Sequence, residues 1–223
     1  MVDKPKSSLK ETNALKYIES DEKKSKPIYE RPFFTKKYQS KSKQEWFKLS
    51  PKRGRILLPN LIDKTHKVSI NRENYPVDKK LICCDPKKKK FEKATFLILY
   101  STFMIYIKEI IGSTSLGGGA LDVSTTDYKN LYFIDLDNID DTLIEEFNSA
   151  FDEFENDNFS STFEELGSNE PNNFDINNVL EQRRNVDKIV LECIFGFNID
   201  EQIKLYKNTI KLMKNRIERS KSV

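Results

Sequence analysis

Short runs of apolar residues alternate with polar ones between residues 55 and 136, and this period-two pattern predicts strands with one buried face. Three runs show it most clearly: RILLPN at 55–60, HKVSIN at 66–71 and KLICC at 80–84. ALDV at 120–123 and LYFIDL at 131–136 have the same character and are expected to be further strands. The middle of the chain is therefore predicted to hold a small sheet.

One stretch is apolar on all sides. It reads ATFLILYSTFMIYI, residues 94–107, and lies within a predicted helix at 91–111. A bilayer span needs about 20 apolar residues, and Lys93 and Lys108 flank this shorter stretch. We therefore expect a buried core helix and no membrane segment.

Helical periodicity is found at both ends of the chain. Residues 9–24 predict a short amphipathic helix, and the last 25 residues repeat apolar positions with spacings of four and three. That C-terminal seam consists of Ile199, Ile203, Tyr206, Ile210, Met213 and Ile217. A second stripe, expected to face this seam from the preceding helix, consists of Val186, Ile189, Val190, Cys193 and Ile194. Gly196 suits a helix C-terminus, and Asn198 with Glu201 suits a capping box. An antiparallel helical hairpin is predicted, packed on its own domain or docked on a partner.

The expected fold class is α+β, a small mixed or antiparallel sheet with a core helix, followed by the C-terminal helical hairpin. Three segments are expected. Residues 1–45 would form an N-terminal helix and a basic extended arm, 46–137 an α+β core, and 138–223 a helical region ending in the hairpin.

The charges are strongly segregated, although the net charge is only +3. Residues 1–110 carry 27 Lys and Arg against 13 Asp and Glu, whereas residues 111–180 carry 1 against 16. Residues 181–223 carry 10 against 6. A basic half of this size indicates an anionic partner such as nucleic acid.

Common catalytic motifs are absent from the sequence, which has no GxGxxG, P-loop or GxSxG pattern. The odd count of three cysteines, two of them adjacent, excludes a disulfide framework and favours a reducing, cytoplasmic location. No CxxC spacing supports a metal site. The single histidine, His66, is expected at the surface or on DNA, because no sequence feature identifies a partner for general-base chemistry.

Four segments, in order, resemble the target-recognition domain of N6-adenine DNA methyltransferases from restriction–modification systems. SLGGGALDVSTTDYKNL (115–131) resembles the glycine-rich turn, strand and polar turn that close that domain. TNALKYIESDEKK (12–24) is similar to a YIxxGE element, with Asp21 in place of its glycine. WFKLSPKRGRILLPNLI (46–62) and residues 182–223 are similar to the family's strand entry and C-terminal hairpin.

The resemblance implies sequence-specific binding of double-stranded DNA by a split or truncated adenine methyltransferase. It implies base-edge contacts from Arg53, Arg55, His66, Lys67 and Arg72. Phosphate contacts would come from the lysines near them, Lys52 included, and from Thr114, Ser115, Gly117, Gly118 and Gly119.

The catalytic elements of that family, an FxGxG loop for S-adenosylmethionine and an (N/D)PP(Y/F) motif for the target adenine, are absent. The chain is therefore expected to lack cofactor and activity by itself and to pair with a catalytic subunit that binds S-adenosylmethionine. Two alternatives are open: a non-enzymatic interaction protein or gene remnant, and a metal-dependent nuclease using Asp135 and Asp137.

Overall fold

The computed structural model describes residues 4–30, 46–47, 52–114, 119–131, 133–154 and 161–219. The chain divides into two compact units, Met1–Lys52 and Arg53–Val223. Helices and small antiparallel sheets together make an α+β protein, which confirms the predicted fold class. The sequence segments 46–137 and 138–223 both contribute side chains to the largest apolar core.

The first unit is built on a short capped helix. Its elements are the 3-10 helix η1 (Lys6–Leu9), α1 (Asn13–Glu22) and the 3-10 helix η2 (Ile28–Glu30). Thr12 caps α1 through its side-chain oxygen. Asp21 is fully buried and accepts a hydrogen bond from the backbone amide of Ile28 at 2.8 Å, which fixes the chain beyond the helix. Ile18 and Trp46 form part of a small apolar cluster.

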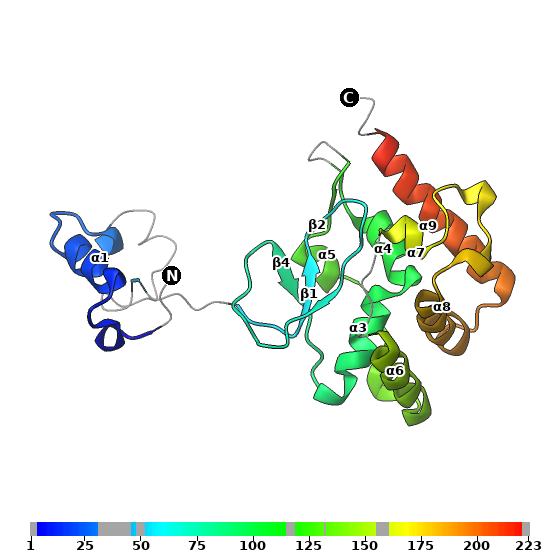
Figure 1. The fold of residues 1–223 in the computed structure, drawn as a ribbon, viewed down its shortest axis with the longest axis horizontal. Coiled ribbons are helices and arrows are strands. Elements are labelled where there is room, and N and C mark those ends of the chain that lie inside the picture. Colours follow the sequence, from blue (N-terminus) through cyan, green and yellow to red (C-terminus); the bar gives the residue numbers. More distant parts are fainter. Residues whose placement is uncertain are drawn as a thin grey trace. The chain divides into compact units, whose positions relative to one another are not determined.

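The second unit contains a three-stranded antiparallel sheet in the order β3-β1-β4, of which Figure 1 labels β1 and β4. The strands are β1 (Ile56–Pro59), β3 (Ser69–Ile70) and β4 (Leu81–Cys83). Ile56 and Leu58 are fully buried and alternate with half-exposed neighbours, as the period-two pattern predicts. β2 (Leu61–Ile62) pairs separately with β5 (Leu121–Asp122).

The prediction of a strand at 131–136 is wrong. Residues 133–135 form no strand, and Leu136 begins the 3-10 helix η5 (Leu136–Asn138), where it is buried in the core. The apolar character of this run therefore reflects packing of an irregular segment against the helices.

The single core helix expected at 91–111 is broken at Ser101. A 3-10 turn, η4 (Lys89–Phe91), leads into α3 (Glu92–Tyr100), and α4 (Thr102–Ile111) follows at a bend of 62°. The Ser101 hydroxyl accepts a hydrogen bond from the amide of Met104 and so caps α4. Among the described residues, no single helix is both long and apolar enough to cross a bilayer.

Side chains distant in sequence satisfy the backbone groups that the break exposes. The carbonyl of Leu99 accepts from Lys108 at 3.4 Å, and that of Tyr100 accepts from Arg183 at 2.9 Å. The carboxylate of Asp187 accepts from both the amide and the hydroxyl of Thr102, at 2.8 and 2.6 Å. A helix end in a core needs such partners, because unpaired buried backbone groups are costly.

One acidic helix, α6 (Asp141–Phe154), covers α3. After α5 (Thr125–Lys129), with its Ser124–Asp127 capping box, α6 lies beside α3 (Figure 1). The ring of Phe96 on α3 makes edge contacts with those of Phe151 and Phe154 at 5.3 Å. These contacts anchor α6 by its buried aromatic stripe and leave its carboxylates outward.

The C-terminal region is helical, as predicted. Its elements are α7 (Thr162–Glu165), η6 (Pro171–Asn173), η7 (Ile176–Asn178), α8 (Glu181–Asp187), a π-helical turn η8 (Lys188–Ile194) and α9 (Ile199–Arg219). Gly196 has φ of 69°, in the left-handed region that favours glycine. Asn198 and Glu201 bond each other's backbone amides, which confirms the predicted capping box.

The hairpin packs on its own unit, but its two apolar stripes do not face each other as expected. The seam of α9 packs along α4, where Tyr206, Ile210 and Met213 cluster with Ile105. The stripe on the preceding helical segment instead joins the core of α3 and α6. The two stripes thus face different clusters, because the broken core helix offers two separate surfaces.

Candidate nucleic-acid interface

The residues expected to contact DNA are distributed over several parts of the structure. Ser115, Gly117 and Gly118 lie outside the described residues. Lys52 is exposed and belongs to the first unit. The remaining seven lie in the second unit and fall into exposed and buried groups.

Arg55 is a structural residue. Its Nη2 and Nε donate to the carboxylate of Glu92 at 2.9 and 3.3 Å, and its Nη1 donates to the carbonyls of Asn71 and Arg72. The hydrogen bond to Glu92 raises the pKa of Arg55. The guanidinium therefore ties the start of β1 to α3 and to the turn after β3, and most of its donors are already used.

That turn displays polar and aromatic side chains at the surface. Asn71 is buried and organises it, since its amide nitrogen donates to the carbonyls of Gly54 and Tyr75 at 3.0 and 2.9 Å. Arg72 and Tyr75 are exposed, and Arg53 donates to the carbonyl of Asn74. Tyr75 is 66% exposed, and sequence reasoning missed it as a possible base-stacking side chain.

His66 is buried, contrary to the expectation of a surface or DNA-contacting histidine. Only 2% of it is exposed, and its Nε2 lies 2.9 Å from Oε1 of Glu109. Burial lowers the pKa of His66 to about 4, although the hydrogen bond with Glu109 opposes this. His66 is therefore neutral at pH 7 and belongs to the interior.

The same carboxylate binds Arg216 from α9. Arg216 donates to both oxygens of Glu109 and also to the carbonyls of Ile62, Asp63 and Gly119. Gly119 has φ of 74° and is buried at the end of the glycine loop. Arg216 thus holds the C-terminal end of β2 and the last residue of the glycine loop in place. Thr114, which precedes the loop, is exposed.

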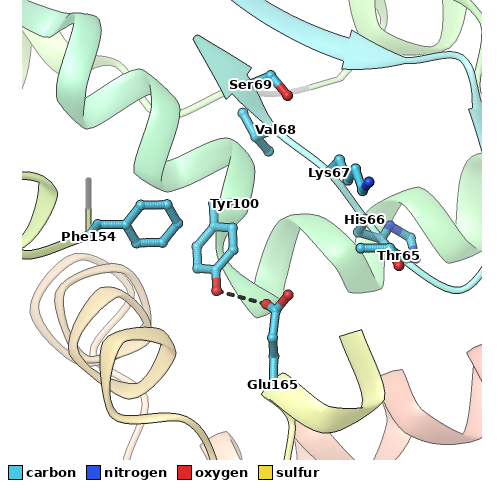
Figure 2. Close-up of a pocket in the computed structure, with 8 residues that line it drawn as sticks. All are labelled: Thr65, His66, Lys67, Val68, Ser69, Tyr100, Phe154 and Glu165. Carbon is cyan, nitrogen blue, oxygen red and sulfur yellow. Dashed lines mark hydrogen bonds between the residues drawn. The ribbon is translucent and has the colours of Figure 1, made fainter. Parts of the chain in front are cut away.

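Lys67 is exposed on the connection between β2 and β3, and this connection lines a pocket of about 220 Å³ (Figure 2). Tyr100, Phe154 and Glu165 form its other side. The Tyr100 hydroxyl donates to Oε2 of Glu165 at 2.7 Å, as Figure 2 shows. Sequence reasoning missed this site because it combines residues from four separate elements.

Behind the pocket, buried basic and acidic side chains lie close enough to offset each other's charge. Arg183 is fully buried, donates through Nε to Oε2 of Glu165 at 3.0 Å, and lies 3.9 Å above the ring of Tyr100. Burial, together with the nearby charge of Arg183, lowers the pKa of Lys108 to about 7. Burial raises the pKa of Asp187, which accepts from Tyr206 as well as Thr102. These groups hold the helix break together.

The lysine run before α3 is paired with acidic residues of the following segment. Lys88 bonds Asp137 at 2.7 Å, Lys90 lies 3.5 Å from Asp141, and Lys93 bonds Asp152. These pairs are exposed and each contributes little stability. They do neutralise Lys88, Lys90 and Lys93 locally, whereas Lys87 and Lys89 of the same run are exposed.

The carboxylates considered for a nuclease have structural partners. Asp135 accepts from Asn138 and from the amide of Asp137, and Asp137 is paired with Lys88. Within the described residues, no group of three or more His, Cys, Asp or Glu side chains is placed to hold a metal ion. This observation gives no support to the nuclease alternative.

Comparison with known proteins found no matching family model, no matching curated protein and no matching solved structure.

Proposed function

We propose that this chain is the DNA-binding specificity module of a split adenine-N6 DNA methyltransferase. It would bind double-stranded DNA in the cytoplasm and leave S-adenosylmethionine and methyl transfer to a separate catalytic subunit. The observation that carries the proposal is the exposed basic surface around the β3-β1-β4 sheet. The segment 53–80 holds seven Lys and Arg against three Asp and Glu.

Four exposed lysines of this segment have no salt bridge to any described residue: Lys64, Lys67, Lys79 and Lys80. Lysines without an acidic partner attract phosphates by releasing counterions from DNA. Arg53, Arg72 and Tyr75 lie on the same segment and can reach base edges or stack on bases. We assign no base contacts to Arg55, whose guanidinium is engaged by Glu92 and two carbonyls, or to His66, which is buried.

The proposal is tested by fluorescence anisotropy on labelled duplex DNA with a salt titration. Removing one phosphate-binding lysine reduces the slope of log affinity against log salt by about 1. A Lys79→Ala, Lys80→Ala double variant should therefore bind more weakly with a slope shallower by up to about 2. The matched control is Lys88→Ala, which removes a lysine already paired with Asp137 and should bind as the wild type does. Absence of duplex binding at low salt would overturn the proposal.

A non-enzymatic interaction protein is the second candidate, favoured by apolar side chains at the start of α9. Phe195 is 36% exposed and Ile199 is 55% exposed. Exposed apolar groups close together often mark protein contacts. Under the first proposal this surface would bind the catalytic subunit, and under the second it would bind another protein. Replacing Ile199 by Asp should therefore weaken binding to the protein partner under either proposal and leave DNA binding unchanged.

A further inference from the structure

The pocket between the β2–β3 connection and α3 is small and only partly open. Its volume is about 220 Å³, below the roughly 300–1,000 Å³ of pockets that take drug-sized ligands. The space suits a single planar ring system and excludes a whole nucleotide. Its lining comes from residues 65–69, Tyr100, Phe154 and Glu165.

Glu165 gives the pocket an acceptor. The residue is 2% exposed, and its Oε2 already receives Tyr100 and Arg183. No described residue donates a hydrogen bond to the other oxygen, Oε1, although Glu165 lines the pocket. Oε1 is not among the fully buried polar atoms that lack a partner, so it reaches the solvent of the pocket and can still accept a hydrogen bond. A ligand that carries an N–H group would satisfy it.

The other walls suit a flat ring. The rings of Tyr100 and Phe154 meet edge to face at 4.5 Å between centroids on one side. Thr65 and Ser69 add hydroxyl groups on the opposite side, and Lys67 is exposed on the same connection. This connection also belongs to the basic surface proposed to bind phosphates. A base that enters the pocket would therefore keep its DNA phosphates beside the lysines that neutralise them.

We propose that the pocket accepts one unstacked nucleobase bearing an exocyclic amine, whose N–H donates to Oε1 of Glu165. Carboxylates accept hydrogen bonds from base amino groups in this way, and aromatic rings stabilise unstacked bases. Adenine, cytosine and guanine have such an amine, whereas the ring N–H of thymine lies between two carbonyl oxygens that a carboxylate would repel. This inference rests on the proposed DNA binding and adds a base-selective site to it.

The test uses three labelled duplexes that are identical except for one position: fully paired, with one unpaired adenine, and with one unpaired thymine. An unpaired base costs less to unstack than a paired one, so the adenine-bulge duplex should bind about tenfold tighter than the paired duplex. The thymine-bulge duplex should gain little. Thr65→Phe fills the pocket and should abolish the adenine gain while leaving the paired duplex unchanged.

Three further variants separate the outcomes. Ser69→Phe fills the pocket from the exposed strand if Thr65→Phe does not fold. Glu165→Gln should lower the preference for adenine over thymine, and Lys67→Ala should weaken all three duplexes alike. Equal wild-type affinity for the three duplexes, or an adenine gain that survives a filled pocket, would overturn the base site alone. Binding of the adenine bulge without the paired duplex would overturn only the proposed duplex binding, and binding to none would overturn both.

Discussion

Replacing Asp187 by Ala should destabilise the second unit strongly. Asp187 is 1% exposed and accepts three hydrogen bonds, from the amide and hydroxyl of Thr102 and from the hydroxyl of Tyr206, at 2.6 to 2.8 Å. It also faces the buried charge of Arg183. Hydrogen bonds to charged groups contribute about 1.5–3 kcal/mol each, but these three share one carboxylate and will not add fully.

Breaking a buried charged network by removing one partner costs about 3–5 kcal/mol, and we expect a loss in that range for Asp187→Ala. This is a large part of the roughly 5–15 kcal/mol that stabilises a typical domain. Asp187→Asn keeps an acceptor for the Thr102 amide, so its loss should be smaller. Tyr206→Phe should cost about 1–2 kcal/mol in the wild type and less when combined with Asp187→Ala.

Urea denaturation followed by circular dichroism at pH 7.5 measures these differences, with an unchanged m-value as the sign that the folded and unfolded states are comparable. Glu145→Ala removes an exposed carboxylate of α6 and serves as the control, with an expected change within about 0.5 kcal/mol. A loss below about 1 kcal/mol for Asp187→Ala would refute the claim that this carboxylate holds the helix break.

Three further outcomes follow from the interior charges. In the folded state the pKa of His66 is about 4, below its ordinary value of 6.5, so the unfolded state binds more protons between these pH values. The free energy of unfolding should therefore fall as the pH drops from 6.5 to 4. Thermal melts should show a smaller fall for His66→Phe. Lys108 is buried and its ammonium donates to the carbonyl of Leu99, so Lys108→Met should leave that carbonyl without a donor and lower stability at pH 7 by about 1–3 kcal/mol in urea denaturation; a gain would contradict this. Arg216→Lys cannot reproduce the contacts to Glu109 and three carbonyls, so hydrogen exchange around Gly119 should accelerate nearly as much as in Arg216→Ala.

Sequence patterns predicted those helices and strands that are determined by residues close together in the sequence. The alternation of Ile56 and Leu58 located β1, and the Asn198–Glu201 pair located the start of α9. The break at Ser101 could not be predicted, because its partners Arg183 and Asp187 lie more than 80 residues away. The two-residue strand β2 was too short to show any period.

The candidate interface was predicted only in part, for a related reason. Sequence alone does not distinguish an arginine at the surface from one that binds an internal carboxylate, as Arg55 does with Glu92. A usable signal was nevertheless present for the interior charges. Lys108 and Glu109 interrupt an otherwise apolar helix, and charged residues in such a position need buried partners.

The break between α3 and α4 also affects how the chain folds during synthesis. The ribosome makes residues 92–111 long before Arg183 and Asp187, so the groups that satisfy the break do not yet exist when this segment emerges. Until then a strongly apolar stretch has neither its final bend nor its covering helix α9. Exposed apolar segments are prone to aggregation in partly made chains, so residues 92–111 carry that risk until α9 has been made.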